Sequence, residues 1–178
     1  MTTLESRCLE AFPGWLRSLA DDAQKLAGLL EREGSSAAAR RSAASALNYL
    51  FKSLDLIPDG LEDLGFIDDA FVLRVAAAQV AEAERDGGGV LAKLAGEAEL
   101  IREFLGVDYP RLERYTEKLA EGSARGRSVA QILQDAALAS DFVREVKQWA
   151  SGYASPSFAR DTRSLVKLKS FLATRLPA

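Results

Sequence analysis

Six carboxylates gather in one short stretch between Lys52 and Arg74, with no basic residue among them. They are Asp55, Asp59, Glu62, Asp63, Asp68 and Asp69. Carboxylate oxygens are the ligands that Mg²⁺, Ca²⁺ and Mn²⁺ prefer in proteins. Clustered acids also have raised pKa values, which suit acid–base chemistry. The chemistry that this cluster favours is therefore binding of a divalent cation by Asp55, Asp59, Asp68 and Asp69, with metal-dependent hydrolysis as its extension.

The same acids also have a structural interpretation. Asp59 and Glu62 have the spacing of a capping box, which suits a short helical turn. Gly65 is suited to end that turn in the left-handed conformation. Asp68 and Asp69 would then lie in the first turn of the next helix, where carboxylates interact well with free amides and the helix dipole. On this interpretation the acids cap a rigid connection between two helices.

Arg74 is the base nearest to this turn on its C-terminal side, and we expect it to neutralise Asp55, Asp59 or Asp69. Because removing one member of a buried ion pair costs about 3–5 kcal/mol, the residue would then be structural. The spacing of the acids does not fit an EF-hand loop. We prefer the structural interpretation with no bound cofactor, and keep the divalent-cation site as the alternative.

The residue types needed for several catalytic mechanisms are missing. The chain has no histidine, which excludes Ser-His and Cys-His pairs and His-ligated zinc. Its one cysteine, Cys8, excludes a disulfide within the chain and has no evident activating partner. We assign no catalytic residue and do not expect an enzyme, although the acids leave that question open.

Helices are the elements expected to position these residues, because Ala, Leu, Glu and Arg are abundant and apolar residues recur at helical spacing. A short first helix is predicted to end near Phe12, since Pro13 and Gly14 follow it. The other predicted helices cover residues 15–33, 37–53, 66–85, 90–105, 110–121 and 127–151, and a last one that starts at Ser155 and Pro156.

The helix predicted over 66–85 is apolar nearly all round, which is typical of the buried centre of a bundle. The sequence therefore predicts an all-α, multi-helix bundle built around a helix–acidic turn–helix hairpin. Three glycines at 87–89 mark a break. We expect residues 1–88 to form the helical core and residues 89–178 to add helices that pack on it as one domain.

The net charge, the N-terminal pattern and the basic last helix restrict the expected binding partners and the expected cellular location. A net charge of −3 and a pI near 5.2 argue against nucleic acid. The N-terminus lacks a signal-peptide pattern and no apolar run approaches about 18 residues, so we expect a cytoplasmic protein. The last helix carries five bases and one acid between residues 157 and 178. It is either an ordinary bundle helix with a solvated face, an arm that docks on a protein partner, or a helix that lies on a membrane surface.

After Tyr49, the chain contains the runs Asp55-Leu56-Ile57-Pro58-Asp59 and Gly65-Phe66-Ile67-Asp68-Asp69. This pattern resembles the signature of the YkvA-like family, a bacterial domain family of unknown function. Ser53 and Glu62 stand where the family often has Pro. The resemblance covers residues 20–85 and implies no established reaction. It makes Tyr49 and Pro58 part of the structural motif, and its occurrence in membrane-associated relatives admits peripheral membrane contact. We therefore expect an interaction or scaffold module that binds proteins or itself.

Overall fold

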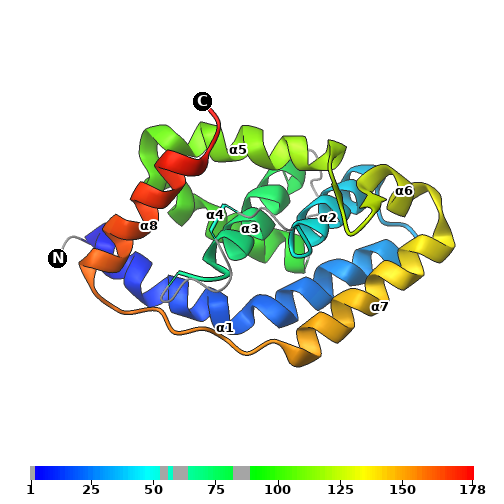
Figure 1. The fold of residues 1–178 in the computed structure, drawn as a ribbon, viewed down its shortest axis with the longest axis horizontal. Coiled ribbons are helices and arrows are strands. Elements are labelled where there is room, and N and C mark those ends of the chain that lie inside the picture. The colour runs from blue at the N-terminus through cyan, green and yellow to red at the C-terminus, as the bar shows by residue number, and fades with distance from the viewer. Residues whose placement is uncertain (1–2, 53–55, 58–63, 82–88) are drawn as a thin grey trace.

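The structure is a computed structural model, which describes residues 3–52, 56–57, 64–81 and 89–178. Most of this part of the chain is helical, and the prediction of an all-α bundle is confirmed (Figure 1). The helices are α1 (Thr3–Glu31), α2 (Ala37–Tyr49), α3 (Ile67–Ala81), α4 (Val90–Leu105), α5 (Tyr109–Lys118), α6 (Val129–Gln134), α7 (Ala136–Gly152) and α8 (Thr162–Arg175). Two 3-10 turns, η1 (Gly106–Asp108) and η2 (Leu119–Glu121), and a small hairpin of β1 (Ser123–Ala124) and β2 (Arg127–Ser128) complete it.

Helix α3 lies at the centre of the bundle. It contacts α1, α2, α4 and α5, and every residue from 67 to 77 is buried. The interpretation of its apolar sequence as that of a central helix is therefore confirmed. Helix α7 packs along α1, and α8 lies across the end of α1 nearest the N-terminus (Figure 1). The division of the chain at residue 88 adjoins residues that the structure does not describe, and it stays a prediction.

The first helix is longer than predicted. The expectation that it ends near Phe12 is wrong, because α1 continues through Pro13 to Glu31. A proline inside a helix costs about 3 kcal/mol through a lost hydrogen bond and a steric clash. Packing on both sides of Pro13 opposes this cost, since the ring of Phe12 lies 5.1 Å from those of Trp15 and Phe71. The core contacts of the side chains outweigh the local signal.

The helix predicted over 127–151 is in fact two helices. Asp135 separates α6 from α7, and its carboxylate accepts hydrogen bonds from the backbone N–H groups of Ala137 at 2.9 Å and Leu138 at 3.2 Å. Aspartate is among the best residues for capping the start of a helix in this way. The apolar periodicity runs across the break, which is why the pattern alone did not show it.

The last helix begins later than the predicted start at Ser155 and Pro156. Helix α8 starts at Thr162 after Asp161, whose carboxylate accepts hydrogen bonds from two N–H groups in the first turn. Residues 153–161 cross from α7 to α8 without regular structure and run beside α1 (Figure 1). The Tyr153 hydroxyl donates to the Leu16 carbonyl at 2.8 Å, which fixes this segment on α1.

Candidate functional site

Helices α2 and α3, which flank the stretch where the sequence predicts an acidic turn, share a buried hydrogen bond between their facing ends. Tyr49 is the last residue of α2, and Asp68 lies in the first turn of α3. The Tyr49 hydroxyl donates to Asp68 Oδ2 at 2.5 Å, and both residues are buried. The same carboxylate oxygen accepts the N–H of Ile57 at 3.3 Å, while the Tyr49 oxygen accepts the N–H of Leu56 at 2.8 Å. One phenol and one carboxylate thus tie both helix ends to the turn between them.

The environment keeps this phenol protonated. Burial raises the pKa of Tyr49 above its ordinary value, and the nearby charges of Asp68 and Asp69 raise it further. A neutral phenol that donates to a carboxylate makes a charge-assisted hydrogen bond, which is short and stronger than one between neutral groups. The phenol of Tyr49 therefore stays protonated, and stays a donor, over the physiological pH range.

The predicted site residues are only partly within the structure. Asp68 and Asp69 lie in the first turn of α3 as predicted, and both are buried. Gly65 is buried just before that helix. The remaining predicted residues, Asp55, Pro58, Asp59 and Glu62, lie outside the described residues. Within the described ranges, no group of three or more His, Cys, Asp or Glu side chains could hold a metal ion. The divalent-cation site stays a prediction.

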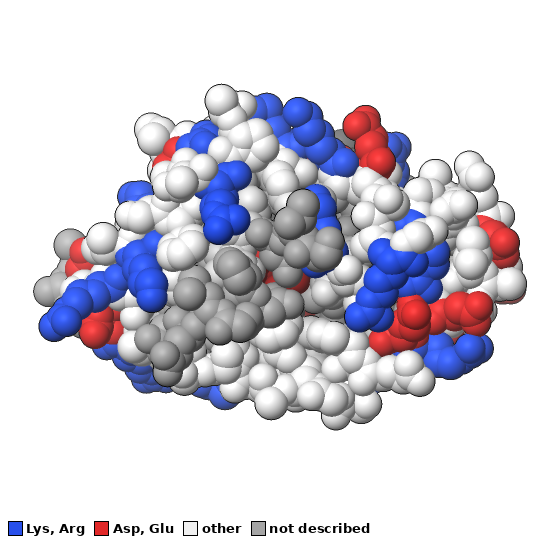
Figure 2. Space-filling view, viewed as in Figure 1, with Lys and Arg blue, Asp and Glu red and all other residues white. Residues whose placement is uncertain are grey.

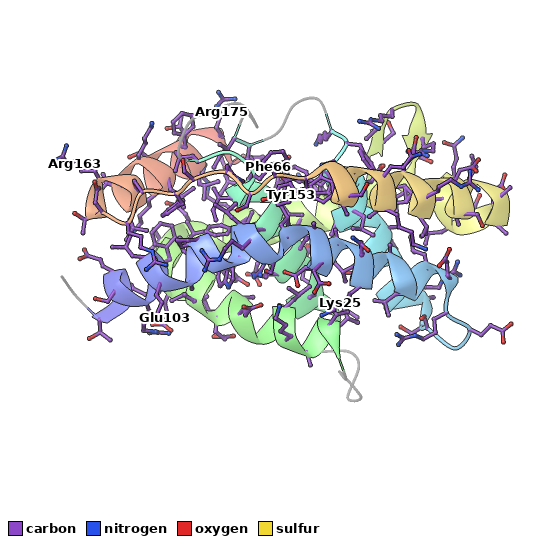
Figure 3. All side chains as sticks on the ribbon, turned by 90° about the horizontal axis from the view of Figure 1, so that it is seen from below. Lys25, Phe66, Glu103, Tyr153, Arg163 and Arg175 are labelled. Carbon is purple, nitrogen blue, oxygen red and sulfur yellow. The ribbon has the colours of Figure 1, made fainter. Side chains whose placement is uncertain are left out.

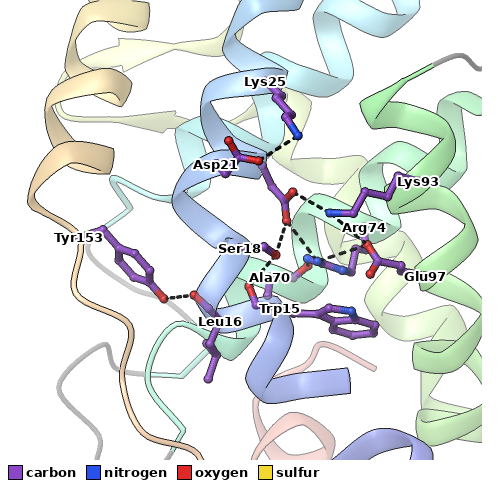
Figure 4. Close-up of polar contacts among 11 residues, drawn as sticks. Trp15, Leu16, Ser18, Asp21, Lys25, Ala70, Arg74, Lys93, Glu97 and Tyr153 are labelled. Carbon is purple, nitrogen blue, oxygen red and sulfur yellow. Dashed lines mark hydrogen bonds and ion pairs between the residues drawn. The ribbon is translucent and has the colours of Figure 1, made fainter. Parts of the chain in front are cut away.

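A second buried polar centre surrounds Arg74 on the other side of α3 (Figure 4). Its fully buried guanidinium lies 3.2 Å from Asp22 Oδ2 and 3.4 Å from Glu97 Oε1. It also donates to the Ala70 carbonyl at 3.0 Å and lies over the ring of Trp15, with 4.4 Å to the ring centroid. Arg74 thereby connects α3 to α1 and α4.

Two further donors satisfy the carboxylate of Asp22. The Ser18 hydroxyl donates to Oδ2 at 2.9 Å, and Lys93 Nζ lies 3.1 Å from Oδ1 (Figure 4). We call Ser18, Asp22, Arg74, Lys93 and Glu97 the Arg74 cluster. Burial lowers the pKa of Arg74 from its ordinary value, and the carboxylates of Glu97 and Asp22 oppose this change. Within the Arg74 cluster, the Arg74 side chain is fully buried, whereas that of Lys93 is exposed to solvent.

From the sequence we expected the partners of Arg74 to be Asp55, Asp59 or Asp69. The ion pairs that the structure shows run instead to Asp22 and Glu97. A signal was present for Asp22, because it lies three residues after Leu19 and four before Leu26, on the apolar stripe of α1. A charged residue on such a stripe requires a buried partner. Nothing local marked Glu97, since it is 23 residues from Arg74 on another helix.

A shallow hollow of about 300 Å³ lies between α2, α3 and α5. We call it the α2/α3/α5 hollow. Among the polar side chains in its walls, Ser42 donates to the Ala76 carbonyl at 2.8 Å and Gln79 to the Glu113 carbonyl at 2.9 Å. The charged side chains of Arg41 and Glu117 also line it and are exposed.

Comparisons with known proteins agree with the region singled out from the sequence. The model of a family described as "Protein of unknown function (DUF1232)" matches residues 39–74, from the first part of α2 to Arg74. No curated protein and no solved structure matches the chain. The matched segment contains Tyr49, Asp68 and Arg74, the centres of both buried polar clusters. Among the described helices, none is long and apolar enough to cross a membrane.

Proposed function

We propose that this protein is a non-catalytic interaction module in which the hairpin of α2, the acidic turn and α3 serves as an internal clamp. The observation that carries this proposal is the use of Asp68. Its Oδ2 accepts hydrogen bonds from the Tyr49 hydroxyl and the Ile57 N–H, both from the protein itself. A carboxylate engaged in this way stabilises the hairpin and is not presented to a substrate.

The Arg74 cluster supports the same assignment. Burying charges costs several kcal/mol per ion, which only good geometry and further hydrogen bonds offset. Arg74 has two carboxylates, one carbonyl and one indole ring around it. Both polar centres of the matched segment thus connect helices to one another. Contacts with partners are then left to the outer surfaces, such as the α2/α3/α5 hollow and the exposed side of α8.

The test separates a clamp from a metal site. Thermal unfolding is measured for the wild type and Asp68→Asn, first with EDTA and then with an excess of Mg²⁺, Ca²⁺ or Mn²⁺. A cation at about 100 times its dissociation constant would add about 2.7 kcal/mol of stability. We expect no cation to shift the wild-type melting temperature, and Asp68→Asn to melt well below the wild type in every buffer.

Asp141→Asn is the matched control, because Asp141 is an exposed helical acid whose partner Arg144 is also exposed. It should melt as the wild type does. A cation-dependent rise in the wild-type melting temperature that Asp68→Asn abolishes would overturn the proposal and establish a metal site.

A further inference from the structure

We infer that the exposed side of α8 binds the surface of an anionic lipid bilayer, an inference that rests on the proposed interaction function and names its partner. Helix α8 lies at one end of the molecule, where Figure 2 shows Lys and Arg side chains. In Figure 3 the side chains of Arg163 and Arg175 point away from the body of the protein.

The positive charge of this surface is not neutralised within the protein. Residues 157–178, which include α8, carry five basic residues, and all five are exposed: Arg160, Arg163, Lys167, Lys169 and Arg175. None of the five forms an ion pair with any residue that the structure describes. Its one acid, Asp161, is used to cap the start of α8. An otherwise acidic protein therefore presents a local cationic surface.

An apolar side chain stands among these charges. Val166 is 66 % exposed, one of the few large apolar residues that reach solvent. Residues three and four apart are neighbours on a helix surface, so Arg163 and Lys169 flank it. Basic residues beside an exposed apolar one suit the boundary between lipid headgroups and acyl chains.

A hollow of about 240 Å³ adjoins Val166, between the first turns of α1, the end of α4 and α8. Its apolar walls include Leu4, Phe104 and Leu165, and Lys169 lies at its edge with Nζ 6.0 Å from the centroid of the Phe104 ring. The acid Glu5 also lines it. Apolar space next to a cationic face complements an amphiphile with an anionic headgroup.

Helix α8 is held firmly enough to present this face. Its inner side buries Leu165, Leu168 and Leu172. From α5, the guanidinium of Arg111 donates to the carbonyls of Ala173 at 3.0 Å and Pro177 at 2.9 Å. The basic side chains therefore project from a fixed support on the outer side of a packed helix.

The features favour a bilayer over other anionic partners. Nucleic-acid binding would gain nothing from Val166 or the hollow, and the net charge of −3 opposes it. An acidic protein surface is best recognised by bases held in fixed geometry by neighbouring groups. Apart from Lys169, which lies near the Phe104 ring, the bases on α8 have no such partners among the described residues, which suits a fluid layer of charged headgroups.

The experiment is sedimentation of the full chain with vesicles. One set contains phosphatidylcholine with about 30 % phosphatidylglycerol, and the other contains phosphatidylcholine alone. We expect binding to the anionic vesicles at about 0.1 M NaCl, loss of binding at about 0.5 M NaCl, and no binding to neutral vesicles. Each neutralised base, as in Lys167→Gln, should weaken partitioning about fivefold.

Two charge-reversal variants make the test specific. Arg163→Glu/Lys167→Glu should abolish binding to anionic vesicles. Arg32→Glu/Lys118→Glu changes the net charge equally, but its exposed bases lie at the end of α1 and in the last turn of α5, and it should bind as the wild type does. Circular dichroism checks that both variants are folded. Val166→Ser should weaken binding at the same salt concentration.

The inference is overturned if the wild type does not bind anionic vesicles, or if both double variants lose binding equally. Binding to duplex DNA or to polyglutamate but not to vesicles would also overturn it. Either result leaves the clamp role of the hairpin intact, since that role is tested by the melting of Asp68→Asn. Conversely, a metal effect in that experiment would not change the vesicle result.

Discussion

The phenol of Tyr49 and the carboxylate of Asp68 meet at 2.5 Å between the end of α2 and the start of α3, although the two residues are 19 positions apart in the chain. Both main-chain N–H groups at residues 56 and 57 donate to this pair. The main chain at residues 56 and 57 is thereby coupled to the packing of α2 against α3. The Tyr49–Asp68 hydrogen bond thus gives the hairpin, for which the sequence left a metal site as the alternative, a structural role.

Loss of Arg74 should destabilise the protein strongly. Arg74→Ala leaves the buried carboxylate of Asp22 without its guanidinium partner, which should cost about 3–5 kcal/mol in unfolding free energy. Replacing both partners by apolar residues, Arg74→Met with Asp22→Leu, should cost less than Arg74→Ala alone. Urea denaturation monitored by circular dichroism measures both. Equal stability of Arg74→Ala and the wild type would show that the ion pair is unimportant.

At Phe66, substitution by glycine should destabilise the protein less than substitution by alanine. Its φ of 68° lies in the left-handed region, which costs roughly 1–2 kcal/mol for a residue with a side chain. Its ring packs against that of Tyr153 (Figure 3), with 5.3 Å between the ring centroids, and lies 6.2 Å from the ring of Trp149. Phe66→Gly and Phe66→Ala both lose these contacts, but only glycine relieves the backbone. We expect the glycine variant to be about 1 kcal/mol more stable. If differential scanning calorimetry showed the alanine variant to be the more stable one, the backbone at Phe66 would not be strained.

Arg111 should hold the end of α8 in place. Its guanidinium donates to carbonyls of Ala173, Leu176 and Pro177. Arg111→Ala should cost roughly 1–3 kcal/mol and speed hydrogen exchange in the last turn of α8. Arg114→Ala, an exposed base on the same helix, should change neither. Unchanged exchange rates in Arg111→Ala would mean that the core leucines alone fix α8.

The thiol of Cys8 should be unreactive in the native protein. Burial raises its pKa from 9.0 to about 11, so the nucleophilic thiolate is scarce near neutral pH. The unfolded state ionises nearer pH 9, so native stability falls as the pH rises from about 9 towards 11. Iodoacetamide should label the native chain at pH 8 far more slowly than the urea-unfolded chain. Equal labelling rates would show that Cys8 is open to solvent.

Helix positions were largely predictable because apolar periodicity reports which face packs inward. The predicted helix 90–105 matches α4, which is bounded by Gly89 and Gly106, both with positive φ angles. Helix boundaries were predicted wrongly at Pro13 and at Asp135. Pro13 was treated as a helix end although the aromatic core holds α1 together across it, and the cap at Asp135 was hidden within a continuous apolar stripe.

The candidate site was predictable only in its local part. Asp68 and Asp69 could be placed in the first turn of α3 because their position depends on near neighbours in the chain. The contact of Arg74 with Asp22 depends on how α1 packs against α3, 52 residues away, and spacing carries no information on that. Buried charges can be recognised from a sequence by their apolar surroundings, but their partners cannot.

The most direct test of the clamp is a double-mutant cycle between Tyr49→Phe and Asp68→Asn, followed by urea denaturation. Each single variant should lose roughly 1–3 kcal/mol, because each leaves a buried polar group without its partner. If the two side chains stabilise the hairpin through their mutual hydrogen bond, the double variant should lose less than the sum of the two, with a coupling energy of about 1–3 kcal/mol. Strictly additive losses would contradict the account.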